Sequence, residues 1–190
     1  AKDRKIVFEA DVFKKNNPIE LKDFPNAKLT EKAAAIYTDK EVTKGKLYNF
    51  LWGDRYRKYF GQKVVAPTVN LDTLYGGLKP FRKGGGHQST SLRLVDKSGS
   101  EYVMRALRKN AVQYLQAVAF KDQYIEDQFN KTYTQDLLLD VFTGSHPYAP
   151  FTIDKLASAI DVYHTKPVLF YVPKQVGLKN FNADFGDELY

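Results

Sequence analysis

Residues 89–108 carry the pattern that most constrains the fold, that of an antiparallel β-hairpin. Residues 91–95 (SLRLV) and 102–107 (YVMRAL) are rich in the apolar and β-branched or aromatic residues of strands. They flank a short polar turn that contains Gly99, and glycine supplies the positive φ that such a turn requires. The sequence therefore predicts a hairpin as the centre of a small sheet.

The chain beyond the hairpin is mainly helical in pattern and ends in a further strand. Apolar residues recur at three- and four-residue spacing in four segments, namely 111–120, 123–130, 134–142 and 152–160. The apolar run 168–172 stops at Pro173 and is typical of a buried strand. The predicted fold class is therefore α+β, with an antiparallel hairpin or small sheet, a helical section and one more strand.

The beginning of the chain differs in pattern from the rest. Residues 1–43 are predicted to be an N-terminal arm with a short helix, and residues 44–190 to be the α+β module. Thr30 is a typical N-cap, and the alanines within residues 31–37 favour helix. We expect the chain to be a fragment of a larger protein, because it starts with Ala1 in place of an initiator methionine.

Residues 44–63 interleave aromatic and basic side chains. Their apolar spacing predicts an amphipathic helix that breaks near Gly53. Such a segment can stack on the bases of a single-stranded nucleic acid, or it can be an aromatic core stripe with a rim of cations. We favour the core stripe and expect no nucleic-acid binding, because no other nucleic-acid signature accompanies the segment.

Charge is unevenly distributed along the chain. The net charge is +7, and residues 44–63 and 76–110 are cationic, whereas the chain from residue 111 onward is mildly acidic. A cationic centre is typical of proteins that bind phosphate, nucleic acid, lipid headgroups or an acidic domain, and also of a solvated lysine-rich surface. No apolar stretch is long enough to cross a bilayer. We expect an anionic ligand or an acidic neighbouring domain as the partner, and no transmembrane segment.

A glycine-rich basic segment before the hairpin is the first candidate binding site. Three consecutive glycines allow backbone amides to approach a ligand closely, and successive exposed N–H groups bind anions. The spacing matches neither a P-loop nor a dinucleotide-binding fingerprint. The alternative is a plain surface turn that enters the hairpin. The predicted phosphate- or nucleotide-binding residues are Gly84, Gly85, Gly86, His87, Gln88, Ser89 and, from the second strand, Arg105.

Arg105 is the second candidate, because a charge inside a strand must face solvent or a partner. An acid of the later helical section, Asp136 or Asp140, is a possible partner for it, and an exposed arginine on the open face of the hairpin is the alternative. A glycine-rich turn, a hairpin with a cation and a helix with acids follow one another in the small lobe of kinase-like folds. Arginine replaces the usual lysine here, and no H-R-D-type catalytic loop follows.

Residue types that carry catalysis are absent or lack the necessary spacing. The chain has no cysteine, which excludes disulfides, thiolate zinc sites and cysteine nucleophiles. Its three histidines lack metal-ligand spacing, and no G-x-S-x-G elbow is present. We therefore expect no complete active site, with no catalytic residue and no metal site, and the sequence leaves any cofactor open.

Distinctive longer runs occur at residues 47–57 (LYNFLWGDRYR), 84–94 (GGGHQSTSLRL), 102–105 (YVMR), 145–149 (SHPYA) and 171–173 (YVP). They resemble a functionally uncharacterised region of large envelope-associated proteins of the Bacteroidota. In those proteins the region follows a calcineurin-like metallophosphoesterase domain and precedes a surface-antigen-type β-barrel. The resemblance covers most of residues 44–190.

This resemblance implies an extracytoplasmic location, in the periplasm or at the outer membrane, and attachment to an outer-membrane protein. It carries no phosphoesterase activity to this chain, because the metal-ligand motifs belong to another domain. We therefore expect a non-catalytic or incomplete module of a metallophosphoesterase-associated envelope protein that binds phosphate or nucleotide. A structural domain that docks on its neighbours is the alternative.

Overall fold

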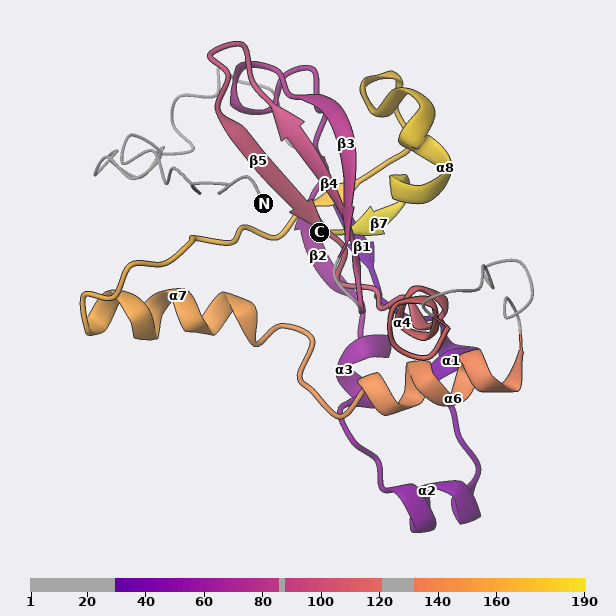
Figure 1. Cartoon of the computed structure of the whole chain (residues 1–190). Helices are drawn as coiled ribbons and strands as arrows, with labels where there is room; N and C mark the ends of the chain where they lie inside the picture. The colour runs from indigo at the N-terminus through magenta and orange to yellow at the C-terminus, as the bar shows by residue number, and fades with distance from the viewer. Residues whose placement is uncertain (1–29, 86–87, 121–131) are drawn as a thin grey trace, which may run out of the picture.

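A computed structural model of the chain describes residues 30–85, 88–120 and 132–190 (Figure 1). It confirms the α+β class, because small antiparallel sheets combine with helices. The strands are β1 (Glu31–Ala34), β2 (Val64–Pro67), β3 (Lys79–Gly85), β4 (Thr90–Val95), β5 (Glu101–Arg105), β6 (Tyr171–Val172) and β7 (Glu188–Leu189). They pair as β1–β2, β3–β4–β5 and β6–β7, each antiparallel.

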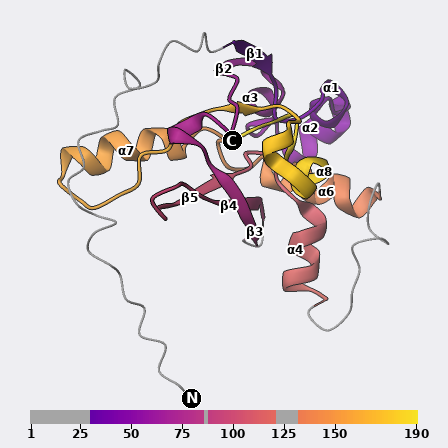
Figure 2. The same cartoon turned by 90° about the horizontal axis from the view of Figure 1, so that it is seen from above.

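The helices surround these sheets and extend to both sides. They are α1 (Asp39–Val42), α2 (Lys46–Trp52), α3 (Arg57–Gly61), α4 (Ala111–Val118), α6 (Tyr133–Phe142), α7 (Pro150–Ala159) and α8 (Asn182–Phe185), with 3-10 segments η3 (Leu74–Gly76) and η4 (Val176–Phe181). α4 and α6 pack together on one side, and α7 extends away on the other (Figure 2). Of the helices in the described ranges, none is long and apolar enough to cross a membrane.

The predicted hairpin is confirmed as β4 and β5. The side chain of Asp96 accepts hydrogen bonds from the backbone N–H groups of Ser98 (2.8 Å) and Ser100 (2.9 Å), which closes the turn. Gly99 has a φ of 88°, the left-handed conformation that glycine adopts without strain. A third strand, β3, pairs with β4 on the side away from β5.

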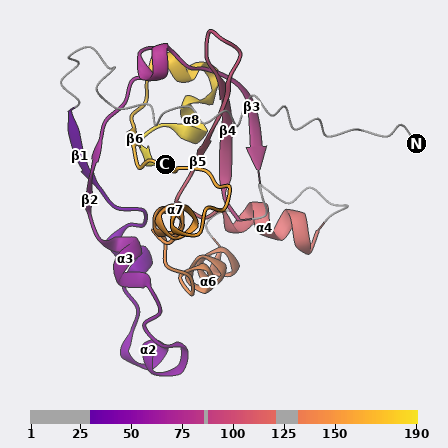
Figure 3. The ribbon, with the colours of Figure 1, turned by 90° about the vertical axis from the view of Figure 1, so that its left-hand side faces the viewer.

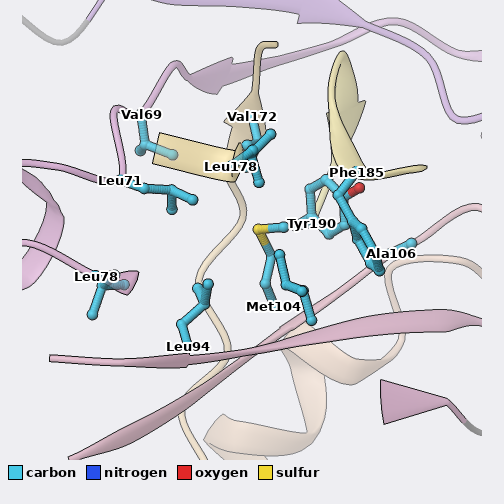
Figure 4. Packing of buried hydrophobic residues seen from close by; sticks show 11 residues of the cluster. Val69, Leu71, Leu78, Leu94, Met104, Ala106, Val172, Leu178, Phe185 and Tyr190 are labelled. Carbon is cyan, nitrogen blue, oxygen red and sulfur yellow. The ribbon is translucent and has the colours of Figure 1, made fainter. Parts of the chain in front are cut away.

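The inner face of the three-stranded sheet forms the main hydrophobic core. Leu94 and Met104 point from β4 and β5 toward Val172 and Phe185 of the C-terminal residues 170–190 (Figure 4), and Leu92 belongs to the same buried cluster. Phe185 is fully buried. Burial of a phenylalanine side chain contributes about 1.5–3 kcal/mol, so the C-terminal segment is an integral part of this core.

The helix predicted for residues 31–37 is wrong, because residues Glu31–Ala34 form strand β1. Their backbone pairs with β2 in the register Glu31↔Pro67 to Ala34↔Val64. Thr30 does not cap a helix; its carbonyl accepts a hydrogen bond from the N–H of Thr68 (2.7 Å). Pairing with a distant strand overrides the helix propensity of the alanines.

The later helices follow the predicted periodicity with shifted ends. The helix predicted for residues 134–142 is α6, and Thr132 caps it by accepting from the N–H of Gln135 (3.3 Å). The helix predicted for residues 152–160 is α7, which already begins at Pro150. Proline fits a first helical position because its missing N–H is not needed there. The helix predicted for residues 123–130 lies outside the described residues.

The predicted strand 168–172 is shorter than its apolar run. The assigned strand β6 contains only Tyr171 and Val172, although Phe170 also exchanges two backbone hydrogen bonds with Tyr190 (2.8 and 2.9 Å). The chain therefore closes with an antiparallel ribbon of β6 and β7 beside the main core.

Candidate functional site

The register of the three-stranded sheet brings two predicted site residues into one row. Gly84 lies opposite Ser91, and Ser91 lies opposite Arg105. Directly opposed residues of antiparallel strands point to the same face, and a Cβ on Gly84 would lie 2.7 Å from the Ser91 Oγ. Gly84 and Arg105 are two strands apart, about 10 Å by the usual strand spacing. They share a surface and do not touch.

The neighbouring row adds two more arginines to the same surface. Arg82 lies directly opposite Arg93, which lies opposite Val103. We call the surface formed by both rows the outer face, defined by Arg82, Gly84, Ser91, Arg93, Val103 and Arg105. Arg82, Val103 and Arg105 are exposed there, so the interpretation of Arg105 as an arginine on the open face is the one that the structure supports.

Like charges directly opposite each other destabilise a sheet, and the outer face contains such a pair in Arg82 and Arg93. Glu101 provides a partial counter-charge, with its Oε2 3.3 Å from Nη1 of Arg93. Both side chains of that ion pair are largely exposed, and exposed pairs contribute at most about 1 kcal/mol. The outer face is therefore a positively charged surface in which the charges are only weakly compensated from within the described residues.

The predicted partnership of Arg105 with Asp140 is wrong. The Asp140 carboxylate accepts hydrogen bonds from the Arg57 guanidinium and from the Tyr48 hydroxyl, the latter at 2.7 Å. Asp136 lies in the first turn of α6, and within the described ranges no ion pair joins it to Arg105. α6 packs against α1 and α4, away from the outer face, and this separation removes the expected parallel with kinase-like folds.

The glycine-rich segment is not an anion-binding turn in its described part. Gly84 and Gly85 end strand β3, and neither has the positive φ that an alternating amide nest needs. A Cβ on Gly85 would overlap the Gln113 amide, so a side chain of the protein covers this position. Gly86 and His87 lie outside the described residues.

The remaining residues of this candidate lie where the chain returns into β4. The carbonyl of Gln88 accepts a hydrogen bond from the N–H of Asn110 (2.9 Å), which ties the segment to the start of α4. Ser89 is buried. Of these two side chains, only that of Gln88 is therefore exposed to a ligand in solution.

A groove of about 610 Å³ begins at the end of β3 and runs between α4 and the C-terminal segment. Gly84, Gly85, Lys109 and Glu188 are among its lining residues. Burial lowers the pKa of Lys109, and the charge of Arg105 lowers it further. Burial raises the pKa of the Glu188 carboxyl, and the positive charge of Arg108, which also lines the groove, offsets only part of this rise.

Other charges of the groove are paired within the protein. Lys83 Nζ lies 2.5 Å from Asp184 Oδ2, and Arg108 pairs with Glu41. Among the described residues, no ion pair engages Lys109. Lys109 is thus the groove cation that is available to a ligand. Its proximity to Arg105 was not evident from the sequence, although both belong to the cationic segment 76–110.

The core-stripe interpretation of residues 44–63 holds for α3 and is wrong for α2. Arg57 and Phe60 of α3 are buried, whereas the large apolar side chains of α2 are exposed. The predicted break near Gly53 is confirmed, with a φ of 74° at that residue.

Comparison with family models, with curated proteins and with solved structures found no match to this chain. No cluster of potential metal ligands occurs within residues 30–85, 88–120 and 132–190. The histidines of the described part have other neighbours. The ring of His146 packs on the ring of Tyr59 (4.7 Å between centroids), and His164 contacts Asp154 (2.7 Å).

Proposed function

We propose that the chain is a non-catalytic docking module whose outer face binds an acidic surface of a neighbouring domain. The observation that carries this proposal is the placement of Arg82 opposite Arg93, with Arg105 in the next row of the same face. Carboxylates of a partner would relieve this repulsion, because arginine binds them with two parallel hydrogen bonds. Arg82, Val103 and Arg105 are exposed around the buried Ser91, and exposed Phe81 occupies the bulge of β3 next to Arg82. Arginine together with apolar and aromatic side chains is typical of protein interfaces.

The proposal extends the resemblance to the Bacteroidota envelope proteins, which supplies the neighbouring domains and the extracytoplasmic location. The test titrates the full chain with the metallophosphoesterase domain that precedes the region in those proteins, at low and at high salt. We expect binding that weakens with salt and that Arg82→Glu with Arg105→Glu abolishes.

The matched control reverses two exposed lysines outside the outer face, Lys32→Glu with Lys155→Glu. It changes the net charge equally and should retain most of the binding. Equal losses in both double variants would indicate non-specific attraction by the net charge, and absence of binding at low salt would reject the docking role.

A second candidate function is binding of phosphate or a nucleotide in the groove beside Gly84 and Gly85. The observation that favours it is Lys109, whose pKa is lowered by burial and by Arg105, so that a bound phosphate would stabilise its charged form. The volume of the groove suits a small ligand. Calorimetry with ATP, ADP and inorganic phosphate tests this function. Lys109→Met should remove the heat of binding and leave domain docking intact, and no heat at millimolar ligand excludes it.

A further inference from the structure

Helix α2 exposes a set of large apolar side chains at the tip of a projection. Figures 1 and 3 show α2 extending from α3, at the end of the molecule far from β3–β5. The exposed fractions are 72% for Leu47, 84% for Phe50, 65% for Leu51 and 53% for Trp52. Soluble monomers rarely expose such contiguous apolar groups, and those that do usually bind something there.

The other face of α2 is held by a buried polar cluster at its base. The Tyr48 hydroxyl donates to Asp140 Oδ2 (2.7 Å), and Arg57 Nη1 donates to Asn49 Oδ1 (2.9 Å). Leu47, Phe50 and Leu51 have the spacing of residues that share a helix face. Since Tyr48 and Asn49 are tied to the body of the protein, this apolar face is directed outward.

Basic residues lie beside the apolar tip and at its base. Lys46 and Lys58 are exposed, and Asp54 is the acid of this stretch. Arg55 is exposed but donates a hydrogen bond to the Val141 carbonyl of α6 (3.3 Å), and the partly exposed Lys44 has its Nζ 5.7 Å from the centre of the Tyr48 ring. Arg57 is excluded from this count because it is buried against Asp140. The tip is thus an exposed apolar face, which we call the apolar crown, with basic residues at its border.

We propose that α2 inserts into the interfacial region of an anionic lipid bilayer. Amphipathic helices that separate large apolar side chains from lysine and arginine bind in this way. In α2, Leu47, Phe50 and Leu51 form the outward apolar face, and exposed Trp52 and Lys46 lie at its edge. The tryptophan ring suits the boundary between headgroups and acyl chains, and the basic border suits anionic headgroups. A convex tip with cations around an apolar crown matches a bilayer better than it matches a protein groove, whose apolar floor would also have to accept that border.

This inference is independent of the proposed docking function, because α2 and the outer face share no residue. An anionic membrane could also attract the arginines of the outer face by charge alone. Insertion of α2 differs from that attraction because it moves the ring of Trp52 from water into the headgroup region.

Trp52 is the single tryptophan of the chain. It ends α2 and is 53% exposed, with its ring 6.4 Å from that of Tyr48, so its fluorescence reports on the edge of the apolar face. The experiment titrates the full chain with vesicles of phosphatidylcholine mixed with phosphatidylglycerol, and with vesicles of phosphatidylcholine alone. We expect the Trp52 emission to shift to shorter wavelength and to lose its quenching by iodide with the anionic vesicles. The shift should be smaller with the neutral vesicles.

Two serine double variants distinguish α2 from other apolar surfaces. Phe50→Ser with Leu51→Ser should lower the partition coefficient at least about tenfold, because two large side chains no longer enter the membrane. Leu156→Ser with Ile160→Ser removes similarly exposed apolar groups in and beside α7 and should leave it unchanged. Lys46→Glu should lower the partition coefficient on anionic vesicles about fivefold or more.

Three results would overturn the proposal. The first is an unchanged Trp52 spectrum with anionic vesicles. The second is vesicle binding that survives the variant in α2 or disappears with the variant at α7. The third is a spectral shift that rises with protein concentration in the absence of lipid, which would assign the tip to contact between two copies of the chain.

Discussion

The buried pair of Arg57 and Asp140 offers the sharpest test of how this module is held together. Their side chains are 5% and 2% exposed, and they join α3 to α6. Tyr48 and Asn49 of α2 complete the cluster, with hydrogen bonds of 2.7 and 2.9 Å. Asp140→Ala would leave the guanidinium buried without its carboxylate.

The expected effect of Asp140→Ala is a loss of about 3–5 kcal/mol in the free energy of unfolding, the usual consequence of removing one partner of a buried ion pair. Tyr48→Phe removes one hydrogen bond to a charged group and should cost about 1.5–3 kcal/mol. Arg57→Met with Asp140→Leu replaces the pair by apolar groups and should recover most of the stability lost in the single variant.

The assay is urea unfolding followed by circular dichroism between pH 3 and pH 7, a range of roughly one unit below to three above the ordinary carboxyl value. Burial alone would raise the pKa of Asp140, but the hydrogen bonds from Arg57 and Tyr48 outweigh it and lower the pKa. A lowered pKa means that the carboxylate stabilises the fold above its unfolded pKa of about 4 and loses this effect as the pH falls through the folded pKa. The difference between wild type and Asp140→Ala should therefore be constant near neutral pH and shrink in acid.

Two results would refute this reasoning. One is a loss below about 1 kcal/mol for Asp140→Ala, the size expected of an exposed pair. The other is a double apolar variant that is no more stable than the single one, since the penalty would then arise from packing and not from an unpaired charge.

Three further predictions concern the rest of the fold. Burial raises the pKa of Glu188, so its carboxyl stabilises the fold most at acid pH; Glu188→Gln should therefore raise the melting temperature more at pH values above the folded pKa than below it. Gly186→Ala should cost about 1–3 kcal/mol in urea unfolding, because its Cβ would lie 2.8 Å from a backbone oxygen, whereas Gly45→Ala, with nothing within 4 Å, should be neutral. Leu156→Ser with Ile160→Ser should change the free energy of unfolding by less than about 1 kcal/mol, since both side chains are exposed; a larger loss would show that α7 packs against the protein.

Sequence patterns predicted the elements whose signals are local. The hairpin has its turn glycine at position 99, and the helix of residues 133–142 has both its apolar period and its cap at Thr132. β1 was missed because its helix propensity is overridden by a partner that begins at Val64, thirty residues further along the chain. Pairing between strands so far apart along the chain cannot be predicted from the few residues around each strand.

Only part of the candidate site could be predicted, because the rest also depends on strand pairing. Gly84 and Arg105 were both identified, but the register that puts Ser91 between them and Arg82 opposite Arg93 exists only after β3 has paired with β4. A shift of one residue would move every side chain of β3 to the other face. The positive outer face therefore depends on the bulge in β3 as much as on the arginines themselves.

The apolar spacing of α2 illustrates where such patterns stop being informative. The same helical periodicity is produced by a face that meets the core and by a face that meets a partner, and in this chain α3 buries its face while α2 exposes it. The decisive difference is Asp140, which attracts Tyr48 and Arg57 to the body and so directs Phe50 away from it. If that is correct, α2 should sample more orientations in Asp140→Ala, and the vesicle-induced shift of the Trp52 emission should weaken. Docking through the outer face, which lies at the other end of the molecule (Figure 1), should stay intact.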